Sequence, residues 1–297
     1  MRIAIAGSSG FLGSALAADL SSAGHEVLRL VRRPTQLPGE IRWDPAAGLL
    51  DPAALAGVDV AVNLCGASVA RRWTSAYRRK ILDSRVESTA TLARAIAGAQ
   101  RRPAVLLNSS AVGFYGDTGE RAVDEEAPHG RGFLVGVCRA WEAATRPAED
   151  AGVRVLHLRT GLPLDRDAGL LQPLLLPFRL GVGGPLGNGR QYLPWIALPD
   201  WLAAVQFLID RADLAGAVNL TGPTPVTNTE FTRALGALLH RPTLVGVPRL
   251  ALRALLGEFG NEAVASQRVV PGVLLKAGFS FRHPDIVSAL RWALEHQ

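Results

Sequence analysis

The strongest constraint on the fold is a glycine-rich turn that follows the first apolar segment. Ile3 to Ala6 form a short apolar run typical of a buried strand, and apolar residues recur at helical spacing from Phe11 to Leu20. Three glycines lie between them. Gly7 permits a tight turn, Gly10 leaves room for a pyrophosphate, and Gly13 lets the helix pack closely on the strand. The helix N-terminus would attract the phosphate charge. The stretch therefore predicts a dinucleotide site made by Gly7, Ser8, Ser9, Gly10, Phe11, Leu12 and Gly13.

The composition is that of an ordinary globular protein with a large core. The chain has 297 residues, of which 48% are hydrophobic and 20% charged. No apolar run reaches the roughly 18 residues of a membrane span, and the first strand begins too early for a signal peptide to precede it. Two cysteines, Cys65 and Cys138, are too few for a disulfide framework. These features favour a cytoplasmic protein without a membrane partner.

The chain is basic, with a formal net charge of +6 and a pI near 10.1. Such a charge raises the possibility of nucleic-acid binding. Lysine occurs only at Lys80 and Lys276, however, and the arginines are scattered in pairs instead of forming one basic tract with interleaved aromatics. We therefore rank nucleic-acid binding third and expect a small-molecule substrate, with no nucleic-acid partner.

Predicted strands and helices alternate through the first half of the chain. Apolar runs predict strands at 26–31, 41–44, 58–64, 103–109 and 153–159, with helices over 11–23, 74–99 and 132–151 between them. This alternation is the signature of an α/β fold with a doubly wound parallel sheet. We expect a Rossmann domain over 1–165, to which 196–222 returns, and a smaller, mostly helical C-terminal lobe over 166–297. Within the lobe we expect a strand at 218–220 and helices starting near 200 and over 227–240, 248–256 and 284–295.

The second predicted strand ends in an arginine pair, Arg32-Arg33. An NAD-specific fold carries an acidic residue there to bind the ribose hydroxyls, whereas arginine can clamp a 2′-phosphate. The alternative is a solvated turn in an arginine-rich protein. The position of the pair favours NADP(H) as the cofactor.

Other predicted strand ends supply further candidate cofactor contacts. Small residues after the strand at 58–64 would let the backbone lie against the adenine or ribose side of a cofactor, and a polar turn follows the strand at 103–109. Arg85 could contact the cofactor or an anionic substrate, or form a salt bridge to Glu87 or to the acidic loop at 117–126. The candidates in this group are Leu64, Cys65, Gly66, Ala67, Arg85, Ser109, Arg159, Thr160 and Gly161.

Four motifs occur in order along the chain: Gly7-x-x-Gly10-x-x-Gly13, Asn63-Leu-Cys-Gly66, Ser109-Ser110…Tyr115-Gly116 and Arg159-Thr-Gly161. With them the chain resembles the extended short-chain dehydrogenase/reductases. It is most similar to their atypical branch of epimerase-family, or NAD-dependent epimerase/dehydratase-like, proteins. The segments Arg72-Trp73, Gly181-Val-Gly-Gly-Pro185 and Gly189-Arg-Gln191 and the tail from Asn219 to Phe281 also resemble that branch. The resemblance implies a Rossmann fold, bound NADP(H) and a substrate cleft between the sheet and the C-terminal lobe.

The same resemblance exposes a missing motif. Active members of the superfamily use Tyr-x-x-x-Lys, in which the lysine lowers the pKa of the tyrosine. No tyrosine of this chain has a lysine four residues later, and alignment on Glu142 puts Leu134 and Cys138 at the two positions. Ala111 stands where the usual catalytic serine is expected. The standard catalytic triad is therefore absent.

Tyr115 is the best remaining proton carrier, with Ser110 as a possible partner on the same turn. An equally weighted alternative is that Tyr115 only packs against the substrate or a loop. A buried structural role is favoured for Cys138 over a reactive thiol. Gln191, Tyr192 and Trp195 form a candidate substrate rim, although Trp195 could belong to the core.

The histidines show no ligand spacing, so no metal is expected, and His129 alone merits a test for catalysis. The leading function is an NADP(H)-dependent oxidoreductase or epimerase-like enzyme acting on an unidentified small substrate. The second is a catalytically silent NADP(H)-binding sensor or scaffold. Either would be a monomer or a homodimer.

Overall fold

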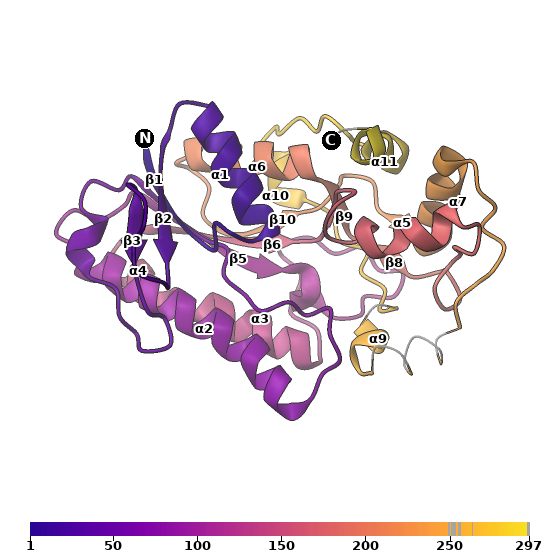
Figure 1. Ribbon diagram of the computed structural model, residues 1–297, viewed down its shortest axis with the longest axis horizontal. Helices are drawn as coiled ribbons and strands as arrows, with labels where there is room; N and C mark the ends of the chain where they lie inside the picture. Colours follow the sequence, from indigo (N-terminus) through magenta and orange to yellow (C-terminus); the bar gives the residue numbers. More distant parts are fainter. Residues whose placement is uncertain (249, 251–253, 255–256, 263, 296–297) are drawn as a thin grey trace.

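A parallel sheet of seven strands forms the centre of the protein (Figure 1). The computed structural model describes residues 1–248, 250, 254, 257–262 and 264–295. The strand order is β10-β6-β5-β4-β1-β2-β3, and every neighbouring pair is parallel. The chain winds outward from β1 in both directions, which places a topological switch point between β1 and β4. The strands are β1 (Arg2–Ala6), β2 (Glu26–Val31), β3 (Glu40–Arg42), β4 (Val60–Asn63), β5 (Val105–Ala111), β6 (Arg154–Thr160) and β10 (Gly216–Leu220).

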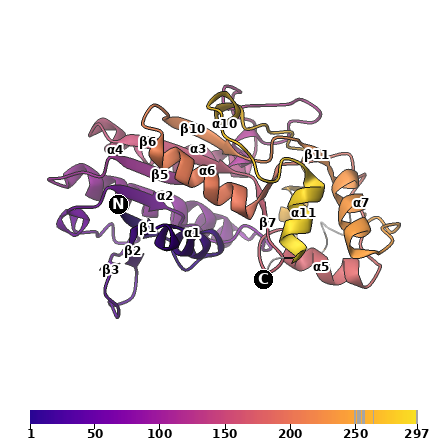
Figure 2. The same cartoon turned by 90° about the horizontal axis from the view of Figure 1, so that it is seen from above.

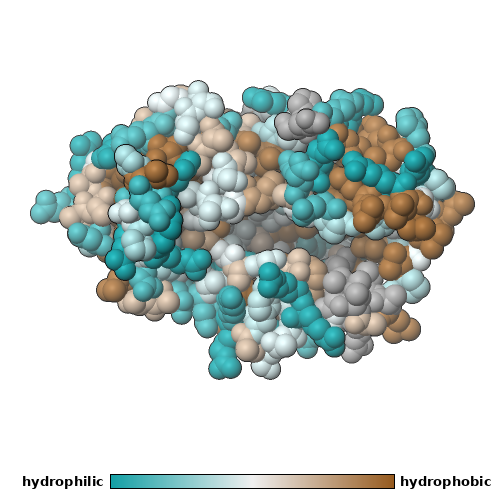
Figure 3. All heavy atoms as spheres, in the orientation of Figure 1, coloured by the Kyte–Doolittle hydropathy of each residue, from teal (hydrophilic) through white to brown (hydrophobic). Residues whose placement is uncertain are grey.

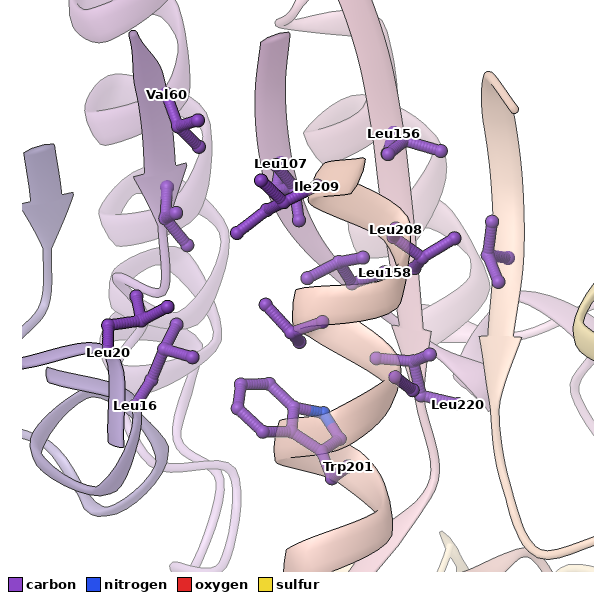
Figure 4. Packing of buried hydrophobic residues seen from close by; sticks show 14 of the residues in the cluster. Leu16, Leu20, Val60, Leu107, Leu156, Leu158, Trp201, Leu208, Ile209 and Leu220 are labelled. Atoms are coloured by element: carbon purple, nitrogen blue, oxygen red, sulfur yellow. The ribbon is translucent and has the colours of Figure 1, made fainter. Parts of the chain in front are cut away.

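Helices cover both faces of this sheet, as the α/β prediction requires. On one face lie α1 (Phe11–Ser22) and α6 (Leu198–Asp210); on the other lie α2 (Ser75–Gly98), α3 (Phe133–Ala143) and α4 (Arg146–Asp150). Figure 4 shows Leu16 and Leu20 of α1 and Trp201 and Leu208 of α6 packed against strand side chains such as Leu158. The sequence-based prediction of a doubly wound Rossmann fold is thus confirmed.

One predicted helix proves to be two. The segment 132–151 forms α3 and α4, separated at Ala144 and Thr145. Pro147 lies in the first turn of α4, where its missing N–H is tolerated, but it could not continue the hydrogen bonding of α3. Short 3-10 helices occur at η1 (Pro52–Leu55) and η2 (Val112–Tyr115). The helix predicted over 248–256 falls largely on residues outside the described ones.

The C-terminal part of the chain builds a second layer of structure at one end of the sheet, where α5, α7 and α11 lie together (Figure 2). Its elements are α5 (Leu171–Arg179), α7 (Asn228–Leu239), α11 (Ile286–Glu295) and the strand pairs β7 (Leu162–Leu164) with β9 (Trp195–Ala197) and β8 (Tyr192–Leu193) with β11 (Val226–Thr227). Two further C-terminal helices lie elsewhere: α10 (Gly272–Lys276) packs on β10, and α9 (Phe259–Glu262) packs beside Trp73. The predicted capping box is present: Thr227 and Glu230 bond each other's backbone at the start of α7. This layer has its own core, in which Phe178, Trp195 and Phe231 are almost fully buried.

Among the described residues, no helix is long and apolar enough to cross a membrane. Nor do the described histidines, cysteines and carboxylates form a group of three or more that could hold a metal ion.

Candidate functional site

The turn between β1 and α1 has the geometry of a phosphate cradle. Gly7 has a φ of +83°, and a Cβ there would lie 2.8 Å from the carbonyl carbon of Leu64. A Cβ at Gly13 would lie 2.1 Å from the Gly7 carbonyl oxygen. A Cβ at Gly10, by contrast, would meet no described atom closer than that same oxygen at 3.4 Å. Gly7 and Gly13 are therefore fixed by internal packing, whereas Gly10 leaves open space in front of the backbone.

The N-terminus of α1 faces this space without a cap of its own. Gly10 is the N-cap residue, and a glycine offers no side chain to bond the first backbone N–H groups. The first turn reads Phe-Leu-Gly-Ser and carries no charge. Ser8 is half-buried beside the turn, and Ser9 is exposed. Uncapped N–H groups and the positive end of the helix dipole together fit a pyrophosphate, so the residues present are suited to a dinucleotide.

The two arginines after β2 have different surroundings in the structure. Both arginines are exposed, but Arg33 forms an ion pair with Glu40 at the start of β3, whereas Arg32 forms none among the described residues. The predicted contact of both arginines with a 2′-phosphate stays a prediction, but their surroundings differ.

The loop after β4 lies over Arg85 of α2. The guanidinium donates to the carbonyls of Ala67 and Ile81, each at 3.0 Å, and a Cβ at Gly66 would lie 3.0 Å from its central carbon. Arg85 also lies 4.9 Å from the centre of the Trp141 ring. Neither predicted salt bridge forms: within the described residues Arg85 has no carboxylate partner, and burial lowers its pKa. Arg85 is thus a partly buried cation beneath the loop predicted to meet the cofactor.

A buried polar network joins the ends of β5, β6 and β10. The Arg159 guanidinium binds both oxygens of Glu142, at 2.8 and 3.0 Å, and also donates to the Tyr115 hydroxyl at 3.0 Å. Ser110 donates to Glu142 at 2.6 Å, so the two predicted proton carriers are connected through Glu142 and Arg159. Tyr115 in turn donates to the Asn219 side chain at 2.8 Å.

In this network, burial and the charge of Arg159 shift pKa values in opposite directions. Burial raises the pKa of Tyr115 above its usual value despite the opposing charge of Arg159. For Glu142, burial alone would raise the pKa, but the hydrogen bonds and charge of Arg159 hold it below its usual value. Tyr115 is only 2% exposed. The tyrosine is therefore neutral and the glutamate ionised at neutral pH, and the catalytic roles predicted for Tyr115 and Ser110 stay predictions.

The remaining predicted residues occupy varied positions. Ser109 and Thr160 are buried at the ends of β5 and β6, and Gly161 packs so closely that a Cβ would lie 2.0 Å from the Pro194 carbonyl oxygen.

Of the predicted substrate rim, the Gln191 side chain is buried and donates to the Leu186 carbonyl, and Trp195 is 1% exposed in the C-terminal core. Tyr192 is half-buried, with the Arg268 guanidinium 4.8 Å from its ring centre. His129 is exposed and bonds the backbone of Gly130.

A small pocket of about 170 Å³ adjoins the position that the family's tyrosine would occupy. Its lining includes Gly113, Gly116 and Leu134 together with the charged residues Asp117, Arg131 and Glu262. Burial raises the pKa of Glu262, and the nearby Asp117 charge adds to the rise. Figure 3 shows the molecule hollowed near the middle of the view, where Figure 1 places the end of β5. Glu262 belongs to α9, so the C-terminal segment contributes to this pocket.

Sequence reasoning missed several members of the site. Glu142 served only to align the α3 helix, Glu125 was considered only as part of the acidic loop at 117–126, and Asn219 and Glu40 received no role. Glu125 is half-buried and accepts from the backbone N–H groups of Asn219 and Val273. Asn219 was detectable, because an asparagine between Val218 and Leu220 interrupts an otherwise apolar strand.

Neither cysteine should behave as a reactive thiol. Burial raises the pKa of Cys138 to about 12 and that of Cys65 to about 12. Because only the thiolate is nucleophilic, we expect iodoacetamide at pH 7.5 to label native protein at least about 100-fold more slowly than an unfolded thiol of pKa ~8.5. Mass spectrometry before and after addition of guanidinium measures this. Rapid labelling of Cys138 in native protein would restore the reactive-thiol alternative.

The chain is similar in sequence to known proteins of one family. The sequence pattern of the NAD dependent epimerase/dehydratase family matches residues 3–136, and that of DUF1731, a domain of unknown function, matches residues 247–293. The epimerase family protein Mb2239 of Mycobacterium bovis is 48% identical, covering 98% of this chain and 97% of that protein. The epimerase family protein YfhF of Bacillus subtilis is 32% identical, covering 98% of this chain and 97% of that protein.

Solved structures extend the likeness to three dimensions. The crystal structure of human epimerase family protein SDR39U1 (isoform2) with NADPH matches with a TM-score of 0.91 and 33% identity, covering 100% of both chains. A UDP-glucose 4-epimerase of Thermus thermophilus in complex with NAD matches with a TM-score of 0.75 at 15% identity, which shows the shared fold alone.

The Rossmann sheet and its glycine turn define an NAD(P)-binding protein of the short-chain dehydrogenase/reductase class. Within that class the chain belongs to the NAD-dependent epimerase/dehydratase family, in the epimerase family branch whose C-terminal segment is DUF1731. The resemblance found in the sequence is confirmed.

Proposed function

We propose that the protein binds NADP(H) across the carboxyl ends of β1, β2 and β4 and is an NADP(H)-dependent oxidoreductase or epimerase-like enzyme for a small substrate. The observation that carries the cofactor assignment is the open space at Gly10 in front of the uncapped α1 helix. Arg32 at the end of β2 adds a cation where an adenosine 2′-phosphate would lie. The human relative SDR39U1, whose structure contains NADPH, supports the same assignment.

A preference for NADPH over NADH is the direct test. We expect NADPH to bind the wild-type protein at least about tenfold more tightly, because one charge-assisted contact to a phosphate contributes about 1.5–3 kcal/mol. The variant R32A/R33A should lose this preference while keeping its affinity for NADH. Fluorescence titration of each cofactor measures both constants. Equal losses for NADPH and NADH would contradict a 2′-phosphate contact.

An active enzyme is supported by the pocket beside Leu134, whose polar lining could orient a small substrate. When bound, NADP(H) would supply the hydride donor or acceptor. Tyr115 and Ser110 are the proposed proton carriers, coupled by Glu142 and Arg159. Absorbance at 340 nm, followed across a metabolite library with the wild-type protein, tests for turnover. Tight NADPH binding without turnover on any compound would favour the second function.

That second function is a catalytically silent NADP(H) sensor or scaffold. Leu134 and Cys138 in place of Tyr-x-x-x-Lys favour it, and so does the saturated hydrogen bonding of the Tyr115 hydroxyl. A silent protein should tolerate Tyr115→Phe combined with Ser110→Ala in a cellular complementation assay, whereas an enzyme should not. We propose a monomer or homodimer located in the cytoplasm in either case, which gel filtration and fractionation can test.

A further inference from the structure

The connection between β2 and β3 is folded around one carboxylate. Glu40 is the first residue of β3, and its side chain is only 3% exposed. It accepts hydrogen bonds from the backbone N–H groups of Gln36, at 2.7 Å, and Leu37, at 3.2 Å. Arg33 binds the same carboxylate, with its Nη1 at 2.9 Å, and Nη1 also donates to the Pro34 carbonyl at 2.9 Å. Glu40 therefore holds both ends of the connection in one conformation.

The ion pair also neutralises Arg33. Hydrogen bonds from Arg33 and from the Gln36 backbone lower the pKa of Glu40 to about 2, so the carboxylate stays ionised across the range in which proteins are handled. The hydrogen bonds and charge of Glu40 raise the pKa of Arg33. A phosphate approaching Arg33 would have to compete with a preformed carboxylate that already occupies both terminal nitrogens.

Arg32 has no such partner. Both arginines are exposed, but in the part of the chain that the structure describes Arg32 forms no ion pair. The Arg32 charge acts on the thiol of Cys65, which follows β4. Arg32 directly follows β2, which pairs in parallel with β1, so its backbone lies at the same carboxyl edge of the sheet as the glycine turn after β1.

We infer that the arginine pair is divided in function: Arg32 is the contact for an adenosine 2′-phosphate, and Glu40 is a positioning residue that sequesters Arg33 and so limits the preference for NADP(H). This inference rests on the proposed cofactor site. It makes Glu40, seven residues beyond Arg33, a determinant of cofactor selectivity that does not itself touch the cofactor.

Three variants separate the two arginines, with the ratio of the NADH and NADPH dissociation constants as the readout. R32A should lower this ratio about 10- to 100-fold, the effect expected of one lost charge-assisted contact. E40Q keeps an oxygen for the Gln36 and Leu37 N–H groups but removes the negative charge that neutralises Arg33, which leaves Arg33 as a second uncompensated cation. We expect E40Q to raise the ratio about threefold or more and to steepen the salt dependence of NADPH binding. R33Q/E40Q removes the ion pair without changing net charge, and its ratio should stay within about threefold of wild type.

The thermal midpoints of the variants show whether the connection is still folded. If Glu40 had only a structural role, E40Q would change the thermal midpoint and both affinities together and would not raise the ratio of the two dissociation constants. A wild-type preference that survives R32A but disappears in R33Q/E40Q would overturn this inference and leave the proposed NADP(H) site intact. Equal wild-type affinity for NADPH and NADH would overturn the proposed cofactor specificity, and the division of the arginines with it.

Discussion

Replacing Gly10 with aspartate should abolish dinucleotide binding without destabilising the fold. Gly10 has an extended backbone, with φ −81° and ψ 170°, at the N-cap of α1. Aspartate is among the most favourable N-cap residues and glycine is only a few tenths of a kcal/mol less so, which means that Gly10→Asp is neutral or slightly stabilising for the apo protein. Its carboxylate would, however, enter the space left for the pyrophosphate. Juxtaposed like charges cost several kcal/mol, so we expect a loss of at least about 100-fold in affinity for NADPH and NADH alike.

The matched control is Gly136→Asp, because Gly136 lies in α3, exposed, with open space at its Cβ position. It should leave both affinities and the thermal midpoint close to wild type. Gly13→Ala provides a contrast: a methyl group 2.1 Å from the Gly7 carbonyl oxygen must displace the turn, so stability and binding should fall together. Calorimetric titration with NADPH and a thermal melt of each variant distinguish these outcomes. Wild-type affinity in Gly10→Asp would exclude the turn as the pyrophosphate site.

The fold could be predicted from the sequence because the patterns that indicate it lie within short segments of the chain. The apolar run before Gly7 and the helical spacing after it are read within twenty residues, and β2 was predicted with the bounds that it has, Glu26–Val31. The division of the chain at residue 165, with 196–222 returning to the Rossmann domain, stays a prediction. β10, which lies within 196–222, pairs with β6 in the sheet.

The site was harder to predict because its contacts join residues that are far apart in the sequence or depend on the direction of a side chain. Arg32 and Arg33 are equivalent in sequence, and only the fold of the connection shows that Glu40 binds one of them. Tyr115 and Asn219 are far apart along the chain and meet because β10 pairs with β6, next to β5. A pattern of residue types predicts which strand ends carry polar groups, but not which of those groups are already paired.

The second large effect concerns the ion pair between Arg159 and Glu142. The two side chains are 6% and 12% exposed, and Arg159 binds both carboxylate oxygens. Arg159→Met would leave the Glu142 carboxylate buried with Ser110 as its remaining hydrogen-bond donor among the described contacts. Removing one partner of a buried pair costs about 3–5 kcal/mol in the free energy of unfolding. In a chain of this size that corresponds to a fall in thermal midpoint on the order of 10 °C.

The pH dependence of this loss provides the sharper measurement. In the wild type, the pair keeps the pKa of Glu142 below its unfolded value, so its contribution is present at neutral pH and disappears as the pH falls through the folded pKa. In Arg159→Met, burial outweighs the remaining Ser110 hydrogen bond and His157 charge and raises that pKa, so the variant should gain stability relative to wild type on going from pH 7 to pH 5. The double variant E142Q/R159M removes the stranded charge and should recover most of the loss at pH 7. Urea unfolding of the three proteins at both pH values measures these differences. A cost below about 1 kcal/mol at pH 7 would place the pair among ion pairs that contribute little, and would remove the basis for treating it as the rigid link between Ser110 and Tyr115.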